Sequence, residues 1–126
     1  MHWAARYVGL PWIAGERDCW AFFRAVQAEH FGRQVQPIDI ESYQPRDIVR
    51  LFENHPERLR WALTTEPSHG DAVLMARNEH PAHVGLWLAD IGRVLHCAEG
   101  IGVLCQDPTS LRFNGWANLT YWTPCN

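Results

Sequence analysis

The first third of the chain carries bulky hydrophobic side chains at helical spacing. These side chains are Trp20, Phe22, Phe23, Val26 and Phe31. Their period predicts an amphipathic helix over residues 19–31. Asp18 is suited to the N-cap, because its carboxylate can accept from free N–H groups of the first turn, and Gly32 is suited to the left-handed position after the last turn. The start and stop signals therefore agree and place Cys19 at the beginning of the helix.

The second half of the chain has a different pattern, in which short apolar runs alternate with turn residues. The expected strands are residues 72–76, 83–88, 93–98, 103–106 and 118–123. Short strands with short connections predict an antiparallel meander. Because helices come first and strands follow, the fold class is α+β, with N-terminal helices packed on an antiparallel sheet of about five strands.

The segment of residues 35–68 separates these halves and reads as a helical insert. Pro45 opens a predicted helix over residues 45–54, since proline is favoured in the first turn. A second short helix is expected over residues 56–63. The Arg and Glu side chains of both form a solvated face.

Composition and charge narrow the functional classes. The 126 residues predict one domain, residues 1–126, with a core of its own. A formal charge of -3 without any basic run argues against nucleic acid as a partner. No apolar stretch is long enough to cross a membrane, so no membrane partner is expected.

Four cysteines allow two disulfides in principle; they are Cys19, Cys97, Cys105 and Cys125. No secretory leader begins the sequence, so free thiols in a reducing compartment are expected.

Cys19 has the position of an activated nucleophile. N–H groups at a helix N-terminus favour the thiolate, which is the reactive form. An imidazole beside Cys19 would complete a nucleophile–base pair. The alternative is that Cys19 is a small buried hydrophobe.

His83 and His96 differ from the other histidines because each stands inside a predicted strand. A hairpin turning near residues 90–92 brings them together. One histidine can then act as a base and the other can orient it. Two hydrogen-bonded core histidines are the alternative. A zinc site is disfavoured, because no metal-ligand spacing is present and Cys97, next to His96, would point to the opposite face. We expect no metal and no cofactor.

Several motifs in order along nearly the whole chain resemble the NlpC-like cysteine peptidases, papain-like cell-wall hydrolases of bacteria and phages. The motifs are Gly9-Leu10-Pro11-Trp12, Asp18-Cys19-Trp20, Gly70-Asp71, His83-Val84-Gly85-Leu86-Trp87-Leu88 and Val94-Leu95-His96. The resemblance implies a papain-like fold with Cys19 as nucleophile, His83 as general base and acid, and His96 as its orienting group. It also implies hydrolysis of an amide bond in peptidoglycan stem peptides, commonly between D-γ-glutamyl and a diamino acid.

Two departures from the family pattern refine this expectation. Cys19-Trp20-Ala21 replaces the usual Cys-Ser-Gly and looks like the branch found in phage tail and prophage proteins. Trp12 stands where the family often has a tyrosine near the oxyanion site. Trp12, Asp18 and Trp20 are therefore candidates for the oxyanion site or the cleft, with the backbone N–H of Cys19 as a further donor.

The phage-like branch suggests phage tail proteins as partners beside the stem peptide. It also suggests a protein that is cytoplasmic before assembly and then acts on the cell wall from the virion tail. Two alternative functions are a catalytically silent tail-assembly protein and a papain-like acyltransferase or deamidase.

Overall fold

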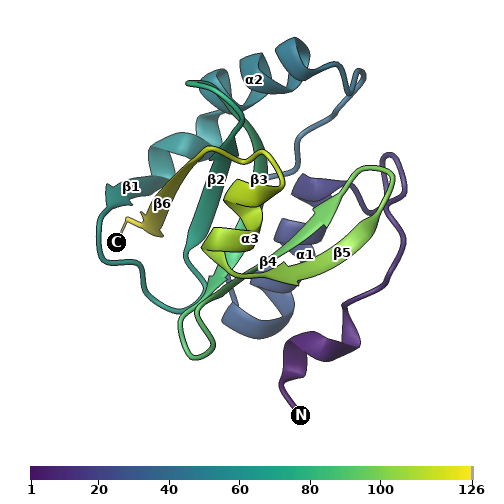
Figure 1. Cartoon of the computed structure of the whole chain (residues 1–126). Helices are drawn as coiled ribbons and strands as arrows, with labels where there is room; N and C mark the ends of the chain where they lie inside the picture. The colour runs from purple at the N-terminus through teal and green to yellow at the C-terminus, as the bar shows by residue number, and fades with distance from the viewer. Residues whose placement is uncertain (126) are drawn as a thin grey trace.

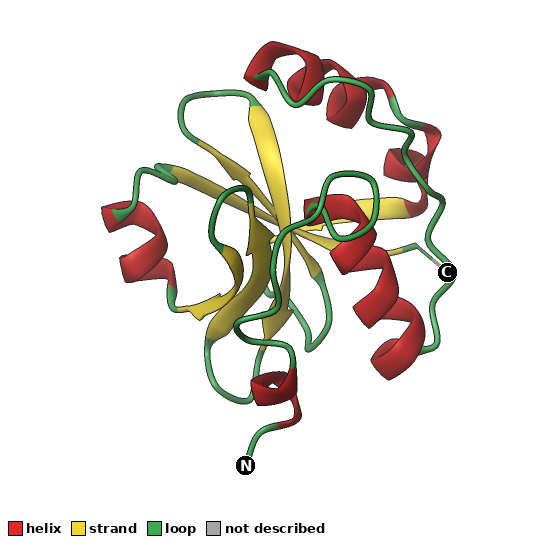
Figure 2. Ribbon diagram, turned by 90° about the vertical axis from the view of Figure 1, so that its right-hand side faces the viewer, coloured by secondary structure: helices red, strands yellow, loops and turns green. Residues whose placement is uncertain are grey.

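The computed structural model describes residues 1–125, which form a six-stranded antiparallel sheet with helices on both faces. Figure 2 shows the sheet in the middle, with α1 and α2 on one side and α3 on the other. The order across the sheet is β1-β6-β2-β3-β4-β5. The strands are β1 (Trp61–Thr64), β2 (Ala72–Ala76), β3 (Pro81–Leu88), β4 (Arg93–Ala98), β5 (Gly102–Gln106) and β6 (Asn118–Pro124). The predicted α+β class is confirmed.

The five predicted strands are all present. Strands β2 to β5 form the expected meander, whereas β6 returns to the other side of β2 and pairs with it antiparallel (Figure 1). The helix α3 (Pro108–Phe113), which links β5 to β6, was not predicted. Its six residues are too few to show a helical period, although Asp107 caps it by accepting from the N–H of Ser110 at 2.7 Å.

The predicted first helix is confirmed as α1 (Cys19–Phe31). Oδ1 of Asp18 accepts from the N–H of Ala21 at 2.8 Å, so the N-cap forms as expected. Gly32 ends the helix in the left-handed region, with a φ of 63°. The short N-terminal segment is a 3-10 helix, η1 (Trp3–Arg6).

The insert is only partly helical. The helix α2 (Pro45–Asn54) has the predicted bounds, and the 3-10 helix η2 (Pro56–Arg60) follows it. The prediction of a helix to residue 63 was wrong, because Trp61–Thr64 is the edge strand β1 and pairs with β6 near the C-terminus. A partner about sixty positions away supplies the hydrogen bonds, and local pattern cannot report it. This strand makes the sheet six-stranded.

Gly70-Asp71, one of the motifs behind the resemblance, has a structural role. The carbonyl of Gly70 accepts from Nε2 of Gln27 on α1 at 2.7 Å. The buried carboxylate of Asp71 accepts from the N–H of Ser68 at 2.8 Å and from the hydroxyl of Thr123 at 3.1 Å. This loop therefore joins α1, β2 and β6.

The sheet divides the interior into two hydrophobic cores. The larger core lies between the sheet and α1 and includes Phe23 and Val84, whereas the smaller core lies on the other face and includes Met75 and Leu111. Within residues 1–125, no helix has the length and apolar character needed to span a membrane.

Candidate active site

Cys19 lies at the N-terminus of α1, where this helix packs against β3. Its side chain belongs to the larger core, and only 8% of the residue is exposed. The pairing of β3 with β4 begins at Gly85 and His96, so Val84 has no partner on β4. The N–H groups of Val84 and Trp20 are directed at the sulfur instead. Cys19 therefore occupies the opening where β3 and β4 separate.

The thiol of Cys19 is protonated in the resting protein. Burial raises its pKa to about 12, and the nearby Asp18 carboxylate raises it too, whereas the N–H groups of Val84 and Trp20 lower it. The expected activation by the helix N-terminus is therefore outweighed by desolvation. For this thiol to act as a nucleophile, a base would have to remove its proton.

His83 and His96 lie in contact, as the hairpin predicts. Nε2 of His83 is 2.8 Å from Nδ1 of His96, and Nε2 of His96 is 2.9 Å from Oε1 of Gln106 on β5. The amide oxygen only accepts, so Nε2 of His96 carries its proton and Nδ1 accepts from His83. In the described chain Nδ1 of His83 makes no hydrogen bond. The chain of contacts therefore leaves a lone pair on Nδ1, as a general base requires.

The hydrogen-bonded chain from Gln106 through His96 to His83 is called the relay below, and Gln106 is the residue of it that sequence reasoning missed. It comes at the end of β5, opposite Val94, and reaches the adjacent His96 along the same face. A polar residue that ends an apolar strand looks like an ordinary strand terminus in the sequence. The available signal was strand alternation: Gln106 comes two positions after Leu104, the residue that pairs with His96, so both lie on the same face as His96.

Both histidines lie on the face of the sheet away from α1. His83 pairs with Met75 and His96 pairs with Gly85, and directly opposite residues share a face. Met75 belongs to the smaller core, whereas Val84 and Cys19 belong to the larger one. No hydrogen bond joins the Cys19 sulfur to the His83 ring among residues 1–125. The structure therefore places the thiol and the imidazole on opposite faces of β3, and the link between them is Val84, which follows His83 and directs its N–H at the sulfur.

His83 is neutral in the folded protein. Burial lowers its pKa well below the ordinary value, and the positive charge of Arg77 acts in the same direction. Burial also lowers the pKa of His96, although its hydrogen bond to Gln106 opposes this. The indole of Trp116 stacks on the His83 ring, with centroids 5.0 Å apart and planes 11° apart. Trp116 thus fixes the plane of the candidate base.

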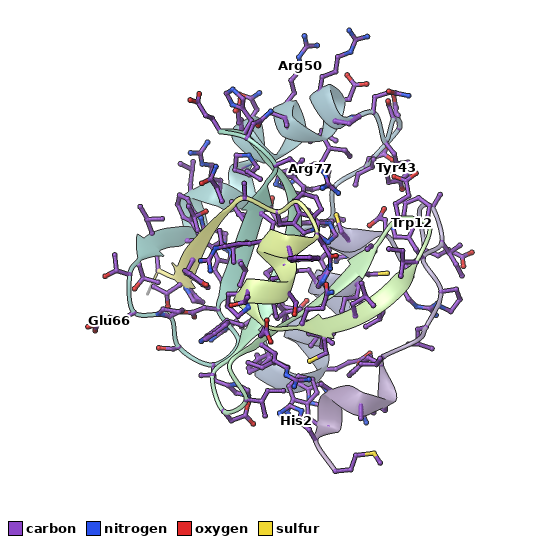
Figure 3. The ribbon with its side chains drawn as sticks, in the orientation of Figure 1. His2, Trp12, Tyr43, Arg50, Glu66 and Arg77 are labelled. Carbon is purple, nitrogen blue, oxygen red and sulfur yellow. The ribbon has the colours of Figure 1, made fainter. Side chains whose placement is uncertain are left out.

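Asp18 and Trp12 support the loop before α1. The second carboxylate oxygen of Asp18 accepts from the hydroxyl of Tyr43 at 2.8 Å, and that hydroxyl accepts from the N–H of Gly15. Trp12 packs edge-on against Tyr43, with ring centroids 4.9 Å apart. Figure 3 shows Trp12 and Tyr43 together at one side of the molecule. Asp18 acts as a cap and a loop anchor.

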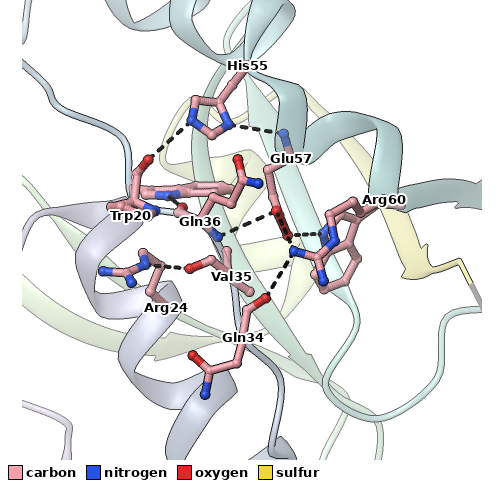
Figure 4. A network of polar contacts seen from close by, with 10 residues as sticks. Trp20, Arg24, Gln34, Val35, Gln36, His55, Glu57 and Arg60 are labelled. Atoms are coloured by element: carbon pink, nitrogen blue, oxygen red, sulfur yellow. Dashed lines mark hydrogen bonds and ion pairs between the residues drawn. The ribbon is translucent and has the colours of Figure 1, made fainter.

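Trp20 does not face the histidines. Its side chain is buried in the larger core, and Nε1 donates to the carbonyl of Gln36 at 2.8 Å (Figure 4). It also lines an apolar cavity of about 50 Å³ between α1, the insert and the sheet. The structure therefore directs Trp20 toward the insert and away from the histidines, because the helical period rotates the residue after Cys19 to that side.

The backbone N–H of Cys19, a candidate oxyanion donor, has no partner in the described chain. This is expected for the first residue of a helix. All four cysteines are free thiols. Cys97 points away from His96 as predicted, and its sulfur donates to the carbonyl of Arg17 at 3.3 Å. Among residues 1–125, no three histidine, cysteine or acidic side chains are placed to hold a metal.

Sequence comparison assigns no family to this arrangement: no protein-family model matches the chain, and no curated protein matches it.

Proposed function

We propose that this protein is a papain-like cysteine peptidase of the NlpC type that hydrolyses amide bonds in peptidoglycan stem peptides. The observation that carries the proposal is the relay from Gln106 through His96 to His83. This relay leaves the Nδ1 lone pair free at the end of β3 that Cys19 contacts. A pair of histidines that only filled the core would not need to leave one ring nitrogen without a hydrogen-bond partner, one residue from the N–H that faces the Cys19 sulfur.

The proposed reaction follows from the protonation states. As the sulfur of Cys19 attacks the substrate carbonyl, Nδ1 of His83 takes the thiol proton. The C–N bond then breaks, the imidazolium protonates the leaving amine, and a thioester remains on Cys19. Water attacks the thioester while His83 accepts its proton, which then returns to the sulfur as the acid product leaves. His96 orients the His83 ring, and the N–H of Cys19 stabilises the oxyanion.

One observation favours a second candidate, a catalytically silent structural protein such as a phage tail component. The thiol is buried and protonated, and the described side chains include no hydrogen bond between it and His83. A reactive enzyme of this design needs a movement that brings the thiol and the imidazole into contact. The delivery of the enzyme to the wall by a phage tail remains part of the same proposal, based on the Cys19-Trp20-Ala21 sequence.

Mass spectrometry of purified sacculi tests the proposal. The wild-type protein should release muropeptides with a new free amine, and Cys19→Ala should release none while keeping its fold. Cys105→Ala is the matched control, because it removes another free thiol from β5 and should retain activity. Equal release by wild type and Cys19→Ala would refute the mechanism.

A further inference from the structure

The loop of residues 12–18 leads directly into Cys19 and is held by hydrogen bonds more than by packing. Residues 13–16 are exposed, and the backbones of Ile13 and Arg17 pair with each other inside the loop. A segment with few buried contacts and exposed backbone hydrogen bonds opens locally at a low cost in free energy. The contacts that attach this loop to the rest of the protein therefore decide how firmly Cys19 is held.

The hydroxyl of Tyr43, which belongs to the insert, joins two points of this loop. It accepts from the N–H of Gly15 at 3.0 Å and donates to Oδ2 of Asp18 at 2.8 Å. Burial and the hydrogen bond to Asp18 raise the pKa of Tyr43 to about 12, so the hydroxyl keeps its proton and remains a donor. The other carboxylate oxygen, Oδ1, caps α1 at the N–H of Ala21. Tyr43 therefore holds Asp18 where it caps the turn that contains Cys19.

The insert and the body of α1 are anchored independently of the Tyr43 hydroxyl. The helix α2 begins two residues after Tyr43 and buries Phe52 in the larger core. Nε1 of Trp20 donates to the carbonyl of Gln36 at 2.8 Å, so the second residue of α1 is attached to the insert by a separate contact (Figure 4). Loss of the Tyr43 hydroxyl would release the loop and Cys19, while the insert and the rest of α1 keep their places.

We propose that Tyr43 is a latch that keeps Cys19 in its buried position, and that opening of this latch exposes the thiol. The latch consists of the two hydrogen bonds from the Tyr43 hydroxyl to Gly15 and Asp18. Tyr43 is a positioning residue, because it acts on Cys19 through Asp18. The use of the latch in catalysis rests on the proposed peptidase function, which needs a movement that brings the thiol to the imidazole. The insert would thereby control access to the candidate nucleophile.

Alkylation of Cys19 measures the latch without any substrate. A buried thiol reacts with iodoacetamide only when its surroundings open, so the reaction rate follows the population of the open form. Tyr43→Phe removes the hydroxyl and keeps the ring that packs against Trp12. Because the variant loses a hydrogen bond to a charged group, we expect Cys19 to react about tenfold faster than in the wild type at the same pH. Peptide mass spectrometry identifies the labelled cysteine.

Tyr7→Phe is the matched control. The hydroxyl of Tyr7 donates to the carboxylate of Glu29 near the other end of α1. This variant also loses a hydrogen bond between a tyrosine and a carboxylate, but it leaves the loop of residues 12–18 unchanged. We expect its Cys19 to react at the rate of the wild type.

Amide hydrogen exchange gives a second readout that a loss of overall stability would not reproduce. In Tyr43→Phe, the N–H groups of Gly15 and Ala21 should exchange faster, because both depend on the latch directly or through Asp18. The N–H of Val26, in the middle of α1 and fully buried, should exchange as in the wild type.

The outcomes separate the latch from the peptidase function. An unchanged Cys19 alkylation rate in Tyr43→Phe, an equal acceleration in Tyr7→Phe, or faster exchange throughout α1 would overturn the latch. Faster alkylation confined to Tyr43→Phe, together with no release of amine from sacculi by the wild type, would establish the latch and refute the peptidase function. Amine release by the wild type with an unchanged alkylation rate in Tyr43→Phe would do the reverse.

Discussion

The two faces of the sheet contribute different halves of the candidate chemistry. The face under α1 supplies the thiol of Cys19 within an apolar core, whereas the opposite face supplies the hydrogen-bonded His83 and His96. The sulfur comes near the residue that carries the candidate base only through the N–H of Val84, beside the point where the pairing of β3 with β4 stops. The comparison teaches that two residues can be close along a strand while their reactive groups lie on opposite faces of the sheet, because successive side chains of a strand alternate. Each face can therefore be changed while the other stays intact.

Removing the base from the histidine face should have the largest effect. In the proposed mechanism His83→Gln lowers amine release by about 10³-fold or more, because no other group can take the thiol proton. His80→Gln is the control, since His80 is an exposed neighbour whose ring contacts Glu53. Turnover of a defined muropeptide measures both. Retained turnover in His83→Gln would show that the relay takes no part in the reaction.

The protonation state of the Cys19 thiol can be tested by its rate of alkylation. With a pKa of about 12, Cys19 should react with iodoacetamide about ten times faster for each pH unit between 7 and 10. Cys19→Ala identifies the labelled site by peptide mass spectrometry. A rate that levels off below pH 7 would instead indicate a thiolate–imidazolium pair, and the sulfur would then already contact His83 in solution.

The histidine face should also control acid stability. The pKa of His83 and that of His96 are lower in the folded than in the unfolded protein. The unfolded chain therefore binds protons first as pH falls through about 6.5, and the folded state loses up to about 1.4 kcal/mol per pH unit for each histidine. Urea unfolding between pH 7.5 and 5 measures this loss. His83→Phe should reduce the slope and His80→Gln should not; equal slopes in all three proteins would contradict the buried, neutral state of His83.

Gly85 keeps β3 and β4 close enough for the relay. A Cβ there would lie 2.6 Å from Cγ1 of Val94 and 3.1 Å from Cβ of His96. Gly85→Ala should lower the free energy of unfolding by about 1–3 kcal/mol and displace His96, which weakens the relay. Gly100→Ala separates steric from backbone effects, because Gly100 has open space around it but a φ of 78°. This variant should lower the free energy of unfolding by about 1–2 kcal/mol through backbone strain and leave activity unchanged. An undisturbed His96 imidazole NMR signal in Gly85→Ala would argue against this role.

Gln106 should give the smallest effect of the series. Gln106→Leu removes the acceptor of the His96 proton. It should lower the free energy of unfolding by about 1 kcal/mol and reduce turnover by about fivefold. The pKa of His96 should fall further, because its hydrogen bond to Gln106 raises it. Imidazole NMR across a pH titration measures that shift. Gln34→Leu, which changes an exposed glutamine, should alter neither quantity.

Local chemistry in the sequence predicted the parts of this fold that depend on near neighbours. The helix from Cys19 to Phe31 follows from its apolar period and its caps, and the strands β2 to β5 follow from short apolar runs joined by tight turns. The contact of His83 with His96 follows from one hairpin. Each of these features depends on residues that are close together in the sequence, so local interactions are enough to predict it.

The tertiary structure decided what depends on distant partners. The edge strand β1 forms because it hydrogen-bonds with β6. Gln106 reaches His96 because β5 pairs with β4 in a register that places Gln106 opposite Val94. The burial that protonates Cys19, and the opposite faces of thiol and imidazole, arise only when α1 packs on the sheet. Desolvation and strand register are properties of the assembled chain, and no sequence window contains them.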